Sequence, residues 1–292
     1  MNIDSNYFNK NDRSNDVKMV ASNFDAILKS SSYTLAHEDR ELLNADEMRG
    51  VRMLLEITKP EHIINKENIL STVIVFGGVN ISENITAKRK LDEAAILLKQ
   101  DPESEENKRN FKRLKNLVSM SYFYDSARKF AKLVSLESQK LNRNSHIIVT
   151  GGGPGIMEAA NRGAYDANCK SIGLNICLPN EQYPNSFVTP GLCFKFNYFE
   201  MRKFHFVMRS VAAVFFPGGF GTLDELFELL TLRQTGMKNN IPIILFGRDY
   251  WSKVINFQYL ADSGLIEDCH LSIFHYADDA EEAWNLIKLY SK

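Results

Sequence analysis

The stretch 211–228, VAAVFFPGGFGTLDELFE, joins a short apolar run to a glycine-rich turn and then to the start of an acidic helix. Residues 211–216 are all Val, Ala or Phe, which is typical of a strand covered on both faces in a parallel sheet. Pro217 ends this strand, and the three glycines in the next four positions permit a turn whose backbone can approach a ligand closely. The stretch therefore predicts a buried strand, a tight turn and a helix.

The start of this helix suits an anion. We expect Thr222 to cap the helix, with free backbone N–H groups and the positive end of the helix dipole at the turn. A phosphate fits such a place, although glycine turns also join strands to helices for compactness alone. Asp224 and Glu225 add two carboxylates to the same turn. A sugar phosphate would account for both features, with its phosphate on the N–H groups and its ribose facing a carboxylate.

Thr222 and Glu225 also have the spacing of a capping box. In that arrangement the Glu side chain accepts a hydrogen bond from the backbone N–H of the cap residue and only stabilises the helix start. A structural role for Glu225 is therefore an alternative to a chemical one.

Strand-like and helix-like segments alternate from residue 72 onward. We expect strands at 72–76, 146–150, 171–177, 211–216, 241–246 and 271–275. We expect helices at 119–142, 154–168, 198–209, 222–235 and 250–263. This order predicts an α/β fold, a Rossmann-like doubly wound parallel sheet with helices on both faces, whose ligand site lies at the carboxyl edge of the strands.

Two further features fall at this edge. The helix expected at 198–209 leads directly into the strand at 211–216, so its first turns, with Arg202, lie at the carboxyl edge. The alternative for Arg202 is an ordinary solvated helix face. Gly152 and Gly153 lie in a second glycine turn, which either forms a wall of the same pocket or only allows tight packing.

The PGGFGTLDE segment, together with Met201-Arg202-Lys203, resembles the signature of the LONELY GUY family of nucleoside 5′-monophosphate phosphoribohydrolases, whose members are often misnamed lysine decarboxylases. The resemblance extends to GGGPGIMEAANRGA at 151–164 and LRQTG at 232–236, and it covers roughly residue 72 to the C-terminus. These forms look like the longer bacterial branch, which is similar to nucleotide nucleosidases.

The resemblance implies hydrolysis of the N-glycosidic bond of an AMP-like nucleoside 5′-monophosphate to a free base and ribose 5-phosphate, with no cofactor. Glu225 would stabilise positive charge on the ribose ring and direct the water, and Arg202 would bind the substrate or protonate the departing base. The residues expected against the substrate or its phosphate are Gly218, Gly219, Gly221, Thr222, Gly152, Gly153, Gly78, Met201 and Lys203. A homodimer or higher homo-oligomer is also implied.

One motif departs from the family. The first strand is followed by Gly77-Gly78-Val79-Asn80, where the family usually shows Gly-Ser and then an Arg that helps to grip the ligand. Asn does not replace the bidentate contact of Arg with a phosphate. The change implies weaker binding, a substituting cation such as Arg128, or altered specificity. A non-catalytic nucleotide-binding or regulatory protein on the same fold is therefore the alternative function.

The sequence lacks the motifs of two other enzyme classes. A nicotinamide dehydrogenase needs GxGxxG after the first strand, and a pyridoxal-dependent decarboxylase needs a Schiff-base lysine with anchoring partners. Neither is evident here. The four cysteines form no CxxC pair and the six histidines no HExxH motif, so we expect buried reduced thiols and no metal site.

Composition sets the remaining expectations. A chain of 292 residues, 44% hydrophobic and with a formal net charge of −1, predicts one α/β domain plus an extension and gives no electrostatic case for nucleic acid or a membrane surface. No apolar run reaches the roughly 20 residues that span a bilayer, and the polar start lacks the apolar core of a signal peptide. We therefore expect a cytoplasmic protein.

The domain arrangement follows from where the periodic segments begin. Residues 1–70 predict a helical extension with a disordered start, packed on the core or on a partner, and residues 71–292 predict the catalytic domain. Helices are expected at 17–29 and 39–57. A charged insertion at about 86–116 predicts a solvated helical excursion, with a lid or an interface as alternatives.

Overall fold

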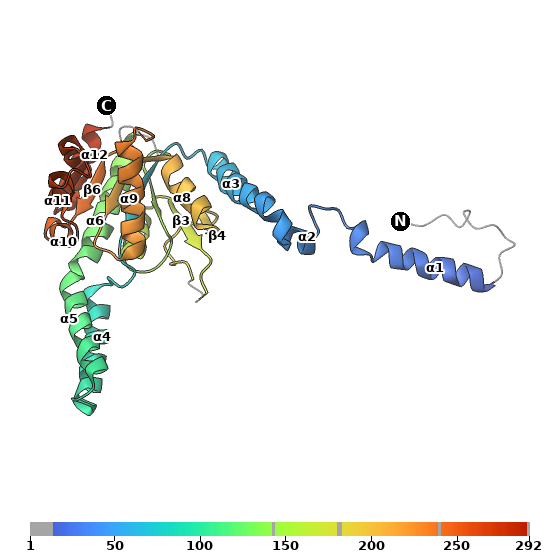
Figure 1. The fold of residues 1–292 in the computed structure, drawn as a ribbon, viewed down its shortest axis with the longest axis horizontal. Coiled ribbons are helices and arrows are strands. Elements are labelled where there is room, and N and C mark those ends of the chain that lie inside the picture. The colour runs from blue at the N-terminus through green and yellow to red at the C-terminus, as the bar shows by residue number, and fades with distance from the viewer. Residues whose placement is uncertain (1–13, 142–143, 180–182, 239–240, 291–292) are drawn as a thin grey trace. The chain divides into compact units, whose positions relative to one another are not determined.

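The structure is a computed structural model, which describes residues 14–141, 144–179, 183–238 and 241–290 (Figure 1). It divides into two compact units, Met1–Leu55 and Glu56–Lys292. The expected disordered start falls on residues 1–13, outside the described residues.

The first unit is helical. It contains α1 (Ser14–Leu28), α2 (Arg40–Asn44), short 3₁₀ helices at Ser31–Tyr33 and Asp46–Met48, and the beginning of α3 (Arg49–Lys66). None of the side chains described between residues 19 and 55 is buried, so this unit builds no core of its own from them. In the part of the chain that the structure describes, no helix has both the length and the apolar composition needed to cross a membrane. The cytoplasmic location stays a prediction.

The second unit is built on a seven-stranded sheet of order β4-β3-β2-β1-β5-β6-β7, in which every neighbouring pair is parallel. The strands are β1 (Thr72–Phe76), β2 (Ile147–Thr150), β3 (Ser171–Ile176), β4 (Cys193–Phe196), β5 (Ser210–Phe215), β6 (Ile243–Phe246) and β7 (Phe274–Ala277). The doubly wound parallel sheet predicted from the sequence is thereby confirmed.

Helices cover both faces of this sheet. The covering helices are α6 (Tyr122–Leu141), α7 (Ile156–Asp166), α8 (Phe199–Met208), α9 (Phe220–Gln234), α10 (Arg248–Val254), α11 (Phe257–Asp262) and α12 (Ala280–Leu289), with a 3₁₀ helix at Asp268–Ser272. Two further helices, α4 (Asn84–Gln100) and α5 (Glu105–Met120), project away from the sheet (Figure 1). Side chains of β1 alternate between two cores. Ile74 packs with residues of α8, α9 and α10, and Val73 packs with residues of α6, α7 and α12.

Three expectations about elements were wrong in detail. Strand β4 was not predicted, because it is a four-residue edge strand with alternating exposed and buried side chains. The last strand begins at Phe274, because the preceding segment forms the 3₁₀ helix. The single helix expected at 250–263 is two helices, because the Asn256 side chain caps the second one by accepting the Tyr259 N–H at 3.0 Å.

The order of the strands positions the site. β1 lies between β2 and β5, and the direction of strand addition reverses at β1. Phe76 is in register with Phe215, so β1 and β5 end at the same level. Crevices at the carboxyl edge of such a reversal are where ligands bind in open parallel sheets.

Candidate active site

The chain turns that follow β1, β2 and β5 pack directly against one another. The Gly78 N–H donates to the Pro217 carbonyl at 2.8 Å, and the Ile156 N–H donates to the Gly78 carbonyl at 3.2 Å. Gly155 has φ of 73°, and a side chain there would collide with the Gly78 carbonyl. Glycine is needed at this contact, because no β-carbon fits between the two turns.

A cavity of about 350 Å³ opens between these turns, a size within the range of small-ligand pockets. Its lining includes seven of the predicted site residues, namely Gly78, Gly153, Arg202, Gly219, Gly221, Thr222 and Glu225. Apolar side chains from β3, α7 and α8 complete the wall. Among the residues that the structure describes, Arg202 and Glu225 are the only charged ones in the lining.

Helix α9 begins earlier than predicted. Its N-cap is Gly219, with no side-chain capping bond, so neither the cap at Thr222 nor the capping box with Glu225 forms. The reason is the extended conformation of Gly219, which lets the first backbone bond run from the Leu223 N–H to the Gly219 carbonyl at 3.0 Å. The N–H groups of Phe220, Gly221 and Thr222 therefore precede the helical ladder, where an anion or water can accept from them.

Gly218 lies beneath this turn and does not line the cavity. A side chain at Gly218 would collide with Thr222, and its carbonyl accepts a hydrogen bond from the Tyr250 hydroxyl at 2.6 Å. Gly218 therefore stabilises the turn through its contacts with Thr222 and Tyr250.

Glu225 lies in the second turn of α9 with its side chain almost fully buried (the residue is 5% exposed). Its Oε1 is 3.4 Å from Nη2 of Arg202. Burial raises the pKa of Glu225 to about 7, against the opposing effect of the Arg202 charge and with a further rise from Glu228. At neutral pH the carboxyl group can therefore both give and take a proton.

Arg202 comes from the first turns of α8, at the carboxyl edge as predicted. Its guanidinium lies over the rings of Phe199, at 5.0 Å, and Phe206, at 5.8 Å. Burial lowers the pKa of Arg202, but an arginine keeps its charge in a protein. The Nε atom is buried and has no hydrogen-bond partner in the structure.

The middle of α3 holds α8 in this position. The Glu56 carboxylate accepts hydrogen bonds from the backbone N–H groups of Asn197, at 2.8 Å, and Tyr198, at 3.2 Å. The Glu56 carbonyl is 2.9 Å from Nε2 of His205. A carboxylate at a helix N-terminus also opposes the positive end of the dipole. Glu56 thus fixes the start of the helix that carries Arg202.

Besides Gly218, three predicted site residues lie outside the described lining of the cavity. Lys203 forms ion pairs with Asp224, at 2.8 Å, and with Glu228, at 3.4 Å. Met201 is partly buried against the core. The Gly152 N–H already donates to Oγ1 of Thr150 at 2.9 Å. These residues contact other parts of the protein and do not line the cavity as described.

Arg128 does not supply the missing cation. Its Nε pairs with Asp166 at 2.5 Å, and Arg128 does not line the cavity. Glu158, one turn into α7, accepts the Tyr124 hydroxyl at 2.7 Å and is also absent from the lining. Arg202 is therefore the single cation of the described lining.

A family model described as "Possible lysine decarboxylase" matches residues 157–287. The chain is 26% identical over 162 residues to cytokinin riboside 5′-monophosphate phosphoribohydrolase LOG3 of Arabidopsis thaliana, covering 54% of this chain and 74% of the relative. It is 28% identical over 156 residues to probable cytokinin riboside 5′-monophosphate phosphoribohydrolase LOG4 of Oryza sativa subsp. japonica, covering 52% of this chain and 66% of the relative. The relatives that it matches are members of the LONELY GUY (LOG) family, to which this chain is similar. The matched segment of the family model contains both Arg202 and Glu225.

Among solved structures, the chain is similar to the X-ray structure of TM1055, with 20% identity and a TM-score of 0.47, covering 75% of this chain and 99% of that one. It is also similar to the Moco carrier protein from Chlamydomonas reinhardtii, with 16% identity and a TM-score of 0.41, covering 76% and 98%. The fold assignment rests on the parallel sheet itself.

Asn175 and Tyr250 are among the residues of the site that were not predicted from the sequence. Asn175 lines the cavity near the end of β3 and is buried, and a lone amide in an otherwise apolar strand was a usable signal. Tyr250 supports the turn through Gly218, 32 residues away in the chain, and no sequence pattern points to that contact.

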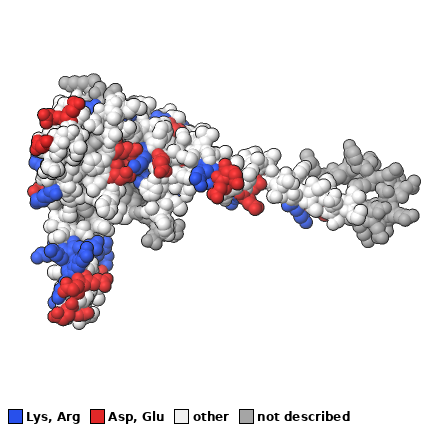
Figure 2. Space-filling model, in the orientation of Figure 1, with Lys and Arg blue, Asp and Glu red and all other residues white. Residues whose placement is uncertain are grey.

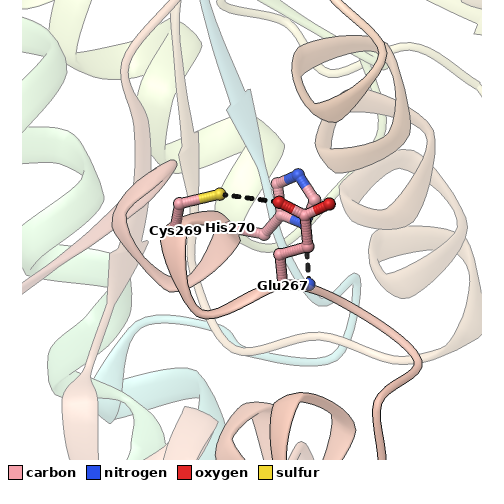
Figure 3. Close-up of side chains that lie close together, drawn as sticks. All are labelled: Glu267, Cys269 and His270. Carbon is pink, nitrogen blue, oxygen red and sulfur yellow. Dashed lines mark hydrogen bonds between the residues drawn. The ribbon is translucent and has the colours of Figure 1, made fainter.

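Outside the cavity, Glu267, Cys269 and His270 bring three potential metal ligands within 4.8 Å of one another (Figure 3). Local bonds account for this grouping. The Glu267 N–H donates to Nδ1 of His270 at 3.0 Å, and the Cys269 thiol lies 3.5 Å from Oε2 of Glu267. The group is a helix cap at the surface. Cys177, Cys193 and Cys269 are exposed and Cys169 is partly buried, so the expectation of buried thiols was wrong.

Proposed function

We propose that this chain hydrolyses the N-glycosidic bond of nucleoside 5′-monophosphates, giving a free base and ribose 5-phosphate. The observation that carries the proposal is the buried pair of Arg202 and Glu225 beside the open N–H groups at the start of α9. The printed names of the relatives, which are phosphoribohydrolases acting on cytokinin riboside 5′-monophosphates, support the same reaction class.

The 5′-phosphate binds at the start of α9. The N–H groups of Phe220, Gly221 and Thr222 donate to its oxygens, and the helix dipole adds positive potential. Gly78 and Gly153 leave room for the ribose, because neither places a side chain in the cavity. Phosphate binding anchors the substrate away from the reacting carbon and holds that carbon near Glu225.

Glu225 acts at the anomeric carbon. As the C1′–N bond breaks, positive charge spreads over C1′ and the ring oxygen, and the buried carboxylate stabilises it. A water adds to C1′ and passes its proton to Glu225. The departing base takes up one proton, so the products are ribose 5-phosphate and a neutral base. A pKa of about 7 suits Glu225 to accept and return this proton.

Arg202 binds and orients the substrate. Arg202 lines the cavity, so its guanidinium can donate to a ring or phosphate oxygen of the nucleotide. Its charge also lowers the pKa of Glu225 and favours the carboxylate. The apolar wall, which includes Met157, Ile176 and Phe199, fits the base, and we propose an AMP-like purine nucleotide as the substrate.

The test is product analysis. Purified protein is incubated with AMP, GMP, CMP, UMP and IMP, and release of free base and ribose 5-phosphate is measured. The matched nucleosides, which lack the phosphate, serve as controls. We expect release from at least one monophosphate and slower release, by about 10²-fold or more, from its nucleoside, because the remote phosphate supplies binding energy. Equal rates with and without the phosphate would contradict the phosphate site.

The second candidate is a nucleotide-binding protein without catalysis. It is favoured by one observation, the single cation in the lining, because the family's second ligand-gripping Arg has no counterpart at Gly78 to Asn80. Stoichiometric binding of a monophosphate by calorimetry, with no base released over many hours, would identify this function.

A further inference from the structure

Helices α4 and α5 form a hairpin that leaves the domain after β1 and extends away from the sheet (Figure 1). Its two ends meet at the base, where Nδ2 of Asn84 donates to Oγ of Ser121 at 2.8 Å. Near its free end, Ser104 caps α5, and Nδ2 of Asn107 donates to the Leu97 carbonyl at 3.3 Å. The hairpin is therefore a closed insertion with a defined base and tip.

The hairpin buries very little of its own surface. Ala87 and Ala94 are the only buried residues of α4, and α5 has none. Ile85, Ile96 and Leu97 are 77%, 56% and 50% exposed. A helix gains most of its stability in a protein by burying an apolar face on another element. A two-helix hairpin that buries so little of its apolar surface indicates that another element packs on it.

Charge is divided along the hairpin. The half next to the domain, residues 84–91 and 112–120, has six cations and no acid, namely Lys88, Arg89, Lys90, Lys112, Arg113 and Lys115. We call this half the collar. The outer half, residues 92–111, has six acids and three cations, and we call it the tip. Its acids are Asp92, Glu93, Asp101, Glu103, Glu105 and Glu106. Figure 2 shows the collar as a blue band and the tip as a largely red end.

Few of these charges are neutralised within the chain. The one ion pair shown for a collar cation is Arg89 with Glu93, at 2.6 Å. At the tip, Lys108 pairs with Glu105 at 3.0 Å and lies 3.9 Å from Glu103. The helices are roughly 25 Å long, so the centres of collar and tip lie farther apart than a Debye length of about 8 Å. Apart from Arg89 and Glu93, which meet at the boundary, the charges of the two halves therefore do not neutralise each other.

We propose that the hairpin is a self-association arm, which pairs antiparallel with the hairpin of a second copy of this chain. A two-fold axis across the middle of the hairpin brings the tip of each copy onto the collar of the other, so both charge contacts are satisfied at once. The same pairing covers Ile85, Ile96 and Leu97 and supplies the element that packs on the hairpin. This inference is independent of the proposed function.

A second copy fits better than another anionic partner. Nucleic acid would be attracted by the collar but repelled by the tip on the same hairpin. An antiparallel copy uses both halves.

The experiment compares association states by sedimentation velocity at low and high salt. The collar variant carries Lys112→Glu, Arg113→Glu and Lys115→Glu. The tip variant carries Asp101→Lys, Glu103→Lys and Glu106→Lys. A charge-keeping control carries Lys112→Arg and Lys115→Arg. A fourth protein replaces residues 85–120 by a short glycine linker, which the contact of Asn84 with Ser121 permits. Circular dichroism checks that the helices persist in the substituted variants.

We expect wild type and the control to show one association step that salt weakens. Each reversed variant alone loses this step, with association weakened about tenfold or more, and matches the hairpin-deleted protein. An equimolar mixture of the collar and tip variants regains it, because every contact is again between opposite charges. The proposal is overturned if all the proteins have the same mass, or if the mixture fails to associate. Binding of a labelled oligonucleotide to wild type and to the collar variant is measured as well. The proposal is also overturned if the collar variant loses this binding while its sedimentation mass equals that of wild type.

Discussion

Nη2 of Arg202 lies 3.4 Å from Oε1 of Glu225, and both side chains are largely shielded from solvent. The Arg202 charge favours the carboxylate, while burial opposes it and prevails, so the pKa of Glu225 lies at about 7. A structural glutamate at a helix start has no need of such an environment. The pair is what distinguishes a chemical role for Glu225 from a capping role.

Activity should rise with pH through a midpoint near 7, because the ionised form of Glu225 is the one that acts. The pH profile of kcat/KM between pH 5 and 9 measures this midpoint.

The free energy of unfolding should change in the opposite direction, falling as the pH rises. The pKa is raised above the value of 4.5, so the folded state holds the proton more tightly and loses stability as the pH rises from about 4.5 to 7. Glu225→Gln should lack this loss, and equal pH dependence of unfolding in both proteins would contradict the raised pKa.

Lys203 should tune Glu225 without touching the substrate. Its charge lowers the pKa of Glu225, and it pairs with the neighbouring acids Asp224 and Glu228. Lys203→Gln should therefore move the acid limb of the pH profile to higher pH, while Lys203→Arg should leave it in place. If Lys203→Gln instead raises KM for the monophosphate with no shift of the profile, Lys203 contacts the substrate directly.

Tyr250→Phe should loosen the phosphate turn, because it removes the 2.6 Å hydrogen bond to the Gly218 carbonyl. We expect a loss of about 1 kcal/mol in the free energy of unfolding and a severalfold higher KM for the monophosphate. Tyr259→Phe is the matched control, because Tyr259 lies on α11 and is 65% exposed. Equal effects of the two substitutions on KM would remove Tyr250 from the support of the turn.

Gly155→Ala should destabilise the fold more than Gly191→Ala. Both glycines have positive φ, 73° and 86°, which costs a side chain about 1–2 kcal/mol. A β-carbon at Gly191 meets open space, whereas one at Gly155 meets the Gly78 carbonyl. The difference between the two melting temperatures isolates the close approach of the turns. Similar losses for both variants would mean that the turns can move apart.

The sequence was sufficient to place Arg202 and Glu225 at one edge, because parallel strands and their connecting helices leave little freedom in topology. It was not sufficient to place Lys203, whose direction depends on how α8 packs against α9. The helix start at Phe220 also escaped prediction, since the Thr222 and Glu225 spacing fits a capping box equally well. The contacts of Glu56 and Tyr250 join segments far apart in the chain and have no local signature.

The most direct test of a chemical role for Glu225 is base release by Glu225→Gln, measured in single turnover with saturating monophosphate. Gln keeps the size of the side chain, and no capping bond is lost, because none forms at the start of α9. We predict a folded protein that still binds the monophosphate but releases base about 10² to 10⁴ times more slowly than wild type. A variant that is folded and as fast as wild type would contradict the assignment of Glu225 as the catalytic carboxylate.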